Sequence, residues 1–184
     1  MAGKILVGTS GWTDPTLLKT DFYPREAKSA EVRLQHYASR FSLVEVDSTY
    51  YALPSDRNSK LWVERTPADF LFNVKAFRLF TQHPTSPTVL PAYIRSSLRK
   101  ETAERPHIYL KDIPEDMQTM LLKLFVDALL PLDSAGKLGV VLFQFPPWFF
   151  PGEENRGHIL RMKEAMGQYR IAIEFRSNSW INEK

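Results

Sequence analysis

The chain has 184 residues, no cysteine and a formal net charge of +3, with 43% hydrophobic and 24% charged residues. This composition is typical of a single soluble globular domain, and the lack of cysteine excludes disulfides, thiolate metal sites and cysteine nucleophiles. We find neither an apolar run of about 18 residues nor the features of a signal peptide, so we expect a cytoplasmic protein without membrane contact.

Strand-like and helix-like patterns alternate along the chain. Short apolar runs predict strands at residues 4–8, 41–47, 70–77, 138–145 and 170–175. Apolar residues spaced three and four apart predict helices at residues 30–41, 56–65, 115–130 and 155–169. This order requires a parallel sheet with right-handed crossovers, and it contains no repeat or second domain, so residues 1–184 are expected to form one domain.

One long connection, residues 81–114, interrupts this order. It is irregular and rich in proline and basic residues, with a short helix expected at residues 92–104. A connection of this length in a compact domain is usually a lid or a binding loop. Its basic residues are Arg95, Arg99, Lys100, Arg105 and Lys111.

The strands after the first carry polar residues on only one of their two alternation classes. Glu45 and Asp47 lie two apart in the second strand, so their side chains point to the same face. The full polar set is Glu45, Asp47, Asn73, Lys75, Gln144, Glu174 and Arg176. The opposite class is apolar, as at Val44, Phe72, Phe143 and Phe175.

This segregation favours a (β/α)8 TIM barrel over a doubly wound open sheet, because inward-facing residues at the C-terminal rim of a barrel line its active site. Only about the first five β/α units are present, relative to the roughly 250 residues typical of the fold. We therefore interpret the chain as a truncated or incompletely represented barrel, or as one completed by another chain. Its last strand would be an exposed edge through which the chain self-associates.

Several motifs resemble those of the YecE-like family (domain of unknown function 72). They are G-T-S-G-W at residues 8–12, F-Y-P at 22–24, V-E-V-D-S-T-Y-Y-A-L-P at 44–54, F-N-V-K at 72–75, T-Q-H at 81–83, L-F-Q-F-P-P at 142–147 and I-E-F-R-S-N-S-W at 173–180. The resemblance implies a TIM barrel of unassigned activity. The chain departs from the family pattern at Asp47, where Asn is frequent, at Gln82, which separates Thr81 from His83, and in lacking the later barrel strands.

Glu45 and Glu174 are the candidate acid/base residues, because burial near strand ends adjusts carboxyl groups for proton transfer. Lys75 is a candidate for stabilising an oxyanion or phosphate, and Arg176 for clamping an anion. The alternative is structural, with both glutamates in ion pairs to Lys75 and Arg176. His83 is a further catalytic candidate, with a plain loop position as its alternative.

The remaining candidates would bind substrate. Thr9, Ser10 and Gly11 form either an anion-binding nest or a tight turn. Four aromatic residues either stack on a sugar or base or pack the rim of the fold: Trp12, Tyr50, Tyr51 and Trp180. Asn73 and Gln144 would orient substrate by hydrogen bonds, and Asp47 would cap the turn that follows it.

The sequence identifies no cofactor. A divalent metal on Glu45, Asp47, Glu174 and His83 is compatible with the ligand types but is not favoured, and we assign no metal ligand.

The leading hypothesis is a hydrolase or lyase acting on a polar small molecule, anionic, phosphorylated or sugar-like, at the C-terminal face of the barrel. The first alternative is a nucleic-acid binding or processing protein that uses the basic insert and the rim aromatics. The second is a non-catalytic scaffold whose polar interior is an ion-pair network.

Overall fold

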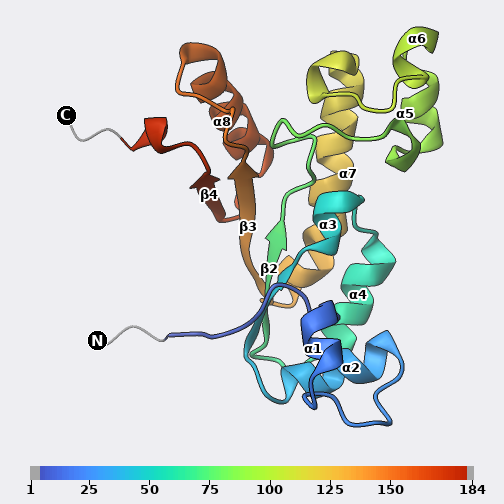
Figure 1. Cartoon of the computed structure of the whole chain (residues 1–184), viewed down its shortest axis with the longest axis vertical. Helices are drawn as coiled ribbons and strands as arrows, with labels where there is room; N and C mark the ends of the chain where they lie inside the picture. The colour runs from blue at the N-terminus through green and yellow to red at the C-terminus, as the bar shows by residue number, and fades with distance from the viewer. Residues whose placement is uncertain (1–4, 182–184) are drawn as a thin grey trace.

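The computed structural model describes residues 5–181, which form an α/β fold around one parallel sheet. Its strands are β1 (Leu43–Val46), β2 (Leu71–Lys75), β3 (Leu138–Phe145) and β4 (Ile171–Phe175), in that spatial order (Figure 1). All neighbouring strands are parallel, as the alternation of strands and helices in the sequence predicts.

Helices connect the strands. The longer ones are α2 (Ala30–Ala38), α4 (Asp56–Glu64), α7 (Glu115–Ser134) and α8 (Glu153–Ala165), and the short ones are α1 (Pro15–Lys19) and α3 (Ser48–Tyr51). Ser29 and Ser55 cap α2 and α4, each accepting a backbone N–H of the first turn. No helix within residues 5–181 is long and apolar enough to cross a membrane.

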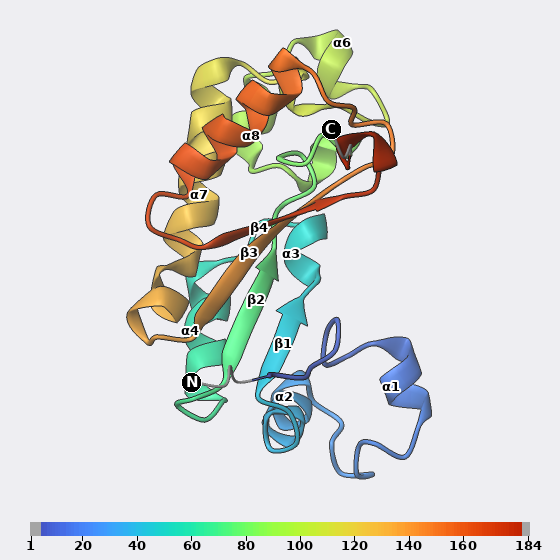
Figure 2. The same cartoon turned by 90° about the vertical axis from the view of Figure 1, so that its left-hand side faces the viewer.

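The two faces of the sheet differ. Buried and half-buried residues alternate strictly along β1, β2 and β3, with residues such as Val44, Phe72 and Phe143 fully buried. These buried residues join side chains of α4, α7 and α8 in one core, and Figure 2 shows α4 and α7 on one side of the strands. The polar strand residues occupy the opposite, half-exposed face.

The predicted first strand is not present. Residues 5–9 have no strand structure, and only Ser10 forms a single parallel bridge, to Glu45; Lys4 lies outside the described residues. Ile5 and Val7 are 88% and 64% exposed, so this segment lacks the apolar contacts that would hold a strand. The segment nevertheless lies beside β1, because the Gly11 N–H donates to the Glu45 carbonyl and the Glu45 N–H donates to the Thr9 carbonyl.

The sheet is open, with β1 and β4 at its edges, so the α/β class is confirmed while closure into a barrel is not. Residues 81–114 fold into short helices, namely η1 (Pro87–Val89), α5 (Ala92–Ser96), α6 (Lys100–Ala103) and η2 (Leu110–Asp112). The expected single helix at 92–104 is thus two helices. Paired backbone hydrogen bonds of 2.9 Å between Thr85 and Ile108 tie the two ends of this insert together.

Candidate functional site

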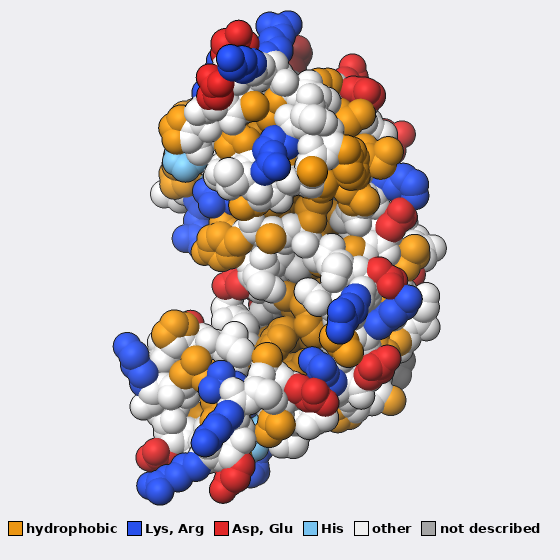
Figure 3. All heavy atoms as spheres, turned by 90° about the vertical axis from the view of Figure 1, so that its right-hand side faces the viewer, with side chains coloured by type: hydrophobic (Ala, Val, Ile, Leu, Met, Phe, Trp, Pro, Cys, Tyr) orange, Lys and Arg blue, Asp and Glu red, His pale blue; other side chains and the backbone are white. Residues whose placement is uncertain are grey.

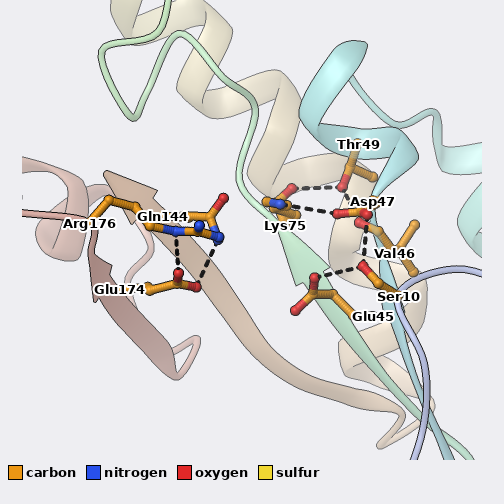
Figure 4. A network of polar contacts seen from close by, with 9 residues as sticks. All are labelled: Ser10, Glu45, Val46, Asp47, Thr49, Lys75, Gln144, Glu174 and Arg176. Atoms are coloured by element: carbon orange, nitrogen blue, oxygen red, sulfur yellow. Dashed lines mark hydrogen bonds and ion pairs between the residues drawn. The ribbon is translucent and has the colours of Figure 1, made fainter. Parts of the chain in front are cut away.

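The C-terminal ends of β1 and β2 carry a connected group of side chains, which we call the β1–β2 cluster: Ser10, Glu45, Asp47 and Lys75. The Ser10 hydroxyl lies 3.1 Å from Glu45 Oε1 and 2.7 Å from Asp47 Oδ2, so it contacts both carboxylates at once. Lys75 Nζ lies 3.2 Å from Asp47 Oδ1. As the sequence predicted, Glu45 and Asp47 point to the same face (Figure 4).

Two details differ from the predicted roles. Asp47 makes no side-chain cap to α3, although capping was its expected role, because its carboxylate is engaged by Ser10 and Lys75 instead. Lys75 pairs with Asp47 rather than with Glu45, which leaves Glu45 Oε2 without a protein partner among residues 5–181. The buried Thr49 fixes the two strand ends, since its hydroxyl contacts the carbonyls of both Val46 and Lys75, at 2.8 and 2.6 Å.

The ends of β3 and β4 carry a second group, the β3–β4 cluster: Gln144, Glu174 and Arg176. Gln144 Nε2 donates to Glu174 Oε2 at 2.8 Å, and Arg176 Nε lies 2.6 Å from Glu174 Oε1. Both carboxylate oxygens of Glu174 therefore have a partner. The Gln144 amide thus binds Glu174, whereas the expected partner was a substrate, and Glu174 forms the ion pair with Arg176 that the structural alternative predicted.

Both clusters lie on the half-exposed face of the sheet (Figure 4). The register pairs Glu45 with Asn73, Lys75 with Leu142 and Gln144 with Glu174, so these residues share one face. No hydrogen bond or ion pair within residues 5–181 joins the clusters, although Lys75 of one and Gln144 of the other lie on the neighbouring strands β2 and β3. The molecule is indented between the part that carries α1 and α2 and the part that carries the insert (Figure 3).

Five of the predicted binding residues line one pocket of about 320 Å³ at the end of β1. They are Ser10, Gly11, Trp12, Asp47 and Tyr51. Tyr51 is 61% exposed, and the buried Trp12 Nε1 has no hydrogen-bond partner among the described residues. The pocket therefore combines an aromatic surface with a hydroxyl and a carboxylate, a set that suits a polar ligand.

Residues 9–11 run alongside β1 through the Ser10–Glu45 bridge and do not form the tight turn that was one of the two expectations. The Thr9 N–H donates to the Tyr37 hydroxyl at 2.7 Å and the Gly11 N–H donates to the Glu45 carbonyl at 2.8 Å, so two of the three amides of the expected anion nest are already used. Gly11 has φ +82°, the left-handed conformation that glycine adopts without strain.

His83 lies beside Tyr50 at the end of β2, with ring centroids 5.4 Å apart. Burial, together with the positive charges of Arg78 and Lys75, lowers the pKa of His83 to about 4. The imidazole is therefore neutral at physiological pH and its Nδ1 lies 2.9 Å from the Thr81 hydroxyl. A neutral His83 would not act as a cationic acid.

Arg78 lies beside Tyr50 and is not among the residues predicted from the sequence. Its guanidinium lies 5.3 Å from the centre of the Tyr50 ring, as Lys75 Nζ does at 5.2 Å. Its buried Nε has no hydrogen-bond partner, and no carboxylate among the described residues pairs with it. The sequence did contain a signal for Arg78, because it is a charged residue only three positions after Lys75, just beyond the end of β2.

Three predicted binding residues have structural contacts. Thr9 is held by Tyr37, as above. Asn73 Oδ1 accepts the Val140 N–H at 3.0 Å, where the pairing of β2 with β3 shifts register. Trp180 stacks on Phe175 with centroids 4.3 Å apart and donates to the Phe149 carbonyl at 2.6 Å, so it packs the rim of the core. Their roles in binding substrate stay predictions.

The conceivable metal ligands are not gathered. Within residues 5–181 no group of three or more His, Asp or Glu side chains is arranged to hold a metal ion. Glu45 and Asp47 share the β1–β2 cluster, whereas Glu174 belongs to the β3–β4 cluster.

The sequence profile of a family described as "Protein of unknown function DUF72" matches residues 6–184. The chain belongs to this family. The YecE-like resemblance of its motifs is thereby confirmed. The UPF0759 protein YunF of Bacillus subtilis is 33% identical over 178 residues, which are 97% of this chain and 52% of that protein.

Solved structures of two DUF72 family proteins are similar to this fold. One, from Enterococcus faecalis, has a TM-score of 0.65 at 21% identity over 96% of this chain and 53% of its own. Another, from Thermotoga maritima, has a TM-score of 0.64 at 26% identity over 97% of this chain and 58% of its own. The chain thus spans about half the length of these DUF72 relatives.

Proposed function

We propose that this chain forms the N-terminal part of a (β/α)8 barrel and that its half-exposed sheet face carries an acid/base active site of the hydrolase or lyase type. The observation that supports this most is the segregation of the sheet, with polar side chains at the ends of β1 to β4 on one face and a helix-covered apolar core on the other. Parallel sheets normally have both faces covered, and in a barrel the polar face would line the interior.

Glu45 is the better placed of the two glutamates for proton transfer. Its Oε2 has no partner among the described residues, and its Oε1 contact with Ser10 orients the carboxylate, whereas both oxygens of Glu174 are engaged by Gln144 and Arg176. Glu174 would then act mainly in positioning, with Arg176 as its partner.

Positive charge at the end of β2 would attract an anionic substrate. Lys75, Arg78 and the neutral His83 surround Tyr50, and Asp47 is the one carboxylate paired with any of them within residues 5–181. A phosphate or carboxylate group would supply Arg78 with the partner it lacks. The substrate class we propose is a polar small molecule with an anionic or sugar-like part, bound beside Tyr51 and Trp12.

The test is turnover of chromogenic para-nitrophenyl phosphates, carboxylic esters and glycosides. Glu45→Gln should lower the rate by about 10²–10⁴-fold, the usual contribution of a general acid or base. Glu104→Gln, which changes an exposed glutamate in the insert, is the matched control and should have no effect. Equal rates for Glu45→Gln and the parent protein, or no turnover of any probe by folded protein, would refute the proposal.

A second candidate function is nucleic-acid binding by the insert. Three of its five basic residues, Arg99, Arg105 and Lys111, line a common cleft of about 470 Å³. Binding of a labelled single-stranded oligonucleotide that weakens steeply with salt would support this function. Absence of binding at low salt would exclude it and leave the scaffold alternative as the rival to catalysis.

A further inference from the structure

A separate cavity of about 540 Å³ lies between the insert and α8, beyond the ends of β2 and β3. Figures 1 and 2 show the insert and α8 together at one end of the molecule. We call it the α8 cavity; the lining residues used below are Lys111, Gln118, Trp148, Asn155, His158 and Arg161. Its volume is within the range of pockets that bind small molecules.

The charges around the α8 cavity are unpaired. Lys111 and Arg161 contribute two positive charges and Glu154 one negative charge, and none of the three forms an ion pair within residues 5–181. The formal charge of the lining is therefore +1, because burial lowers the pKa of His158 and keeps its ring neutral. The cavity therefore favours a ligand with one anionic group.

His158 presents a hydrogen-bond acceptor. Its side chain is 3% exposed, and Nε2 lies 2.7 Å from the Phe80 carbonyl, which can only accept. The proton of the neutral ring is therefore on Nε2, and Nδ1 is an acceptor without a partner among the described residues. Gln118 also offers a hydrogen-bond acceptor. Its Nε2 donates to the Ile113 carbonyl at 2.8 Å, and its Oε1 has no partner among the described residues.

An aromatic surface completes the lining. Trp148 is 54% exposed although it lies against the His83 ring, with centroids 5.8 Å apart. Gln82, which also lines the cavity, has φ +58°, which is uncommon for a residue other than glycine and is often found at functional sites. Its side chain reaches Asn155 of α8, with Nε2 and Oδ1 3.4 Å apart.

We propose that the α8 cavity binds a small planar heterocycle that carries N–H donors and one anionic group, a chemistry represented by nucleoside 5′-monophosphates. The ring stacks on Trp148, its N–H groups donate to His158 Nδ1 and Gln118 Oε1, and the anionic group contacts Arg161 and Lys111. The proposal is independent of catalysis at the sheet face, since no residue of the two polar clusters lines this cavity.

The experiment is calorimetric titration of the chain with the four common nucleoside 5′-monophosphates. Ribose 5-phosphate, which lacks the base, and the nucleosides, which lack the phosphate, separate the two parts of the ligand. At least one monophosphate should bind, and should bind at least tenfold more tightly than either of its parts. Arg161→Gln and Trp148→Ala should each weaken binding by about tenfold or more.

Each variant has a matched control on the same segment. Arg156→Gln changes an exposed arginine of α8 that does not line the cavity, and Phe150→Ala removes a 57% exposed aromatic ring two residues from Trp148. Both should bind like the parent protein. No binding of any monophosphate at millimolar concentration, or binding weakened equally by the controls, would overturn the proposal. Because all four substitutions are at exposed residues, unchanged unfolding curves are expected and exclude misfolding as the cause.

Discussion

The two faces of the sheet are built from the same strands and differ in nearly every physical respect. Phe143 and Gln144 are neighbours in β3, yet Phe143 is fully buried among helix side chains while Gln144 hydrogen-bonds Glu174 on the half-exposed face. Burial of apolar area on one face supplies most of the folding free energy. The other face buries less apolar area, so we expect its residues to contribute less to stability.

The largest expected difference between the faces comes from changing these two neighbours. Phe143→Ala should lower the free energy of unfolding by about 3–5 kcal/mol, since it removes a fully buried ring, and Gln144→Ala by about 1 kcal/mol or less. Urea denaturation measures both. Should Phe143→Ala not fold, Phe143→Leu provides a milder test on the same face. Similar losses for the Phe143 and Gln144 variants would contradict the division of roles.

A smaller effect is expected at Tyr37, which supports the polar face from beneath. Its hydroxyl accepts from the Thr9 N–H at 2.7 Å and donates to the Leu43 carbonyl at 3.1 Å, joining the Ser10 segment to β1. Tyr37→Phe leaves both groups unpaired and should cost about 1–3 kcal/mol. Hydrogen exchange should show faster exchange of the Thr9 amide, whereas unchanged exchange there would mean that the hydroxyl does not hold the segment.

The smallest effect concerns pH, through His83. Its pKa is lowered from 6.5 to about 4, so the folded protein binds fewer protons than the unfolded chain between these values. The stability this group contributes is complete above pH 6.5 and is lost as the pH falls towards about 4. His83→Gln should reduce the loss of stability between pH 7 and pH 5, measured by urea midpoints. His158, whose pKa burial also lowers, contributes in the same direction and remains in the variant. An unchanged pH dependence would show that His83 is not held neutral.

The sequence correctly predicted the four strands and the face of the sheet on which their polar residues lie. This was possible because the alternation of side chains along a strand fixes which residues share a face. It was insufficient at residues 4–8, where an apolar run predicted a strand but no packing surface covers Ile5 and Val7. The pattern of apolar residues within a short segment does not show whether another part of the fold lies beside it and covers its side chains.

Partner choice within the site was also beyond the sequence. Glu45 and Asp47 are equivalent in spacing. Only the three-dimensional positions show that Lys75 pairs with Asp47, which leaves one Glu45 oxygen without a partner in the described part of the chain. Arg78 was overlooked because it follows β2 rather than lying in it. The partners of Lys137 could not be predicted from the sequence either. A lysine between two elements is normally exposed, yet Lys137 is 4% exposed and donates to the carbonyls of Val63 and Thr66, at 2.8 and 2.7 Å.

The register shift between β2 and β3 makes two positions mutually dependent. A Cβ built on Gly139 would lie 2.2 Å from Asn73 Oδ1, the atom that accepts the Val140 N–H. Any residue larger than glycine at position 139 therefore displaces the side-chain amide of Asn73. If Asn73 is replaced by a residue without this amide, the space that it leaves can accommodate an alanine at position 139. We expect strong epistasis between Asn73 and Gly139, with the double replacement less harmful than the sum of the single ones.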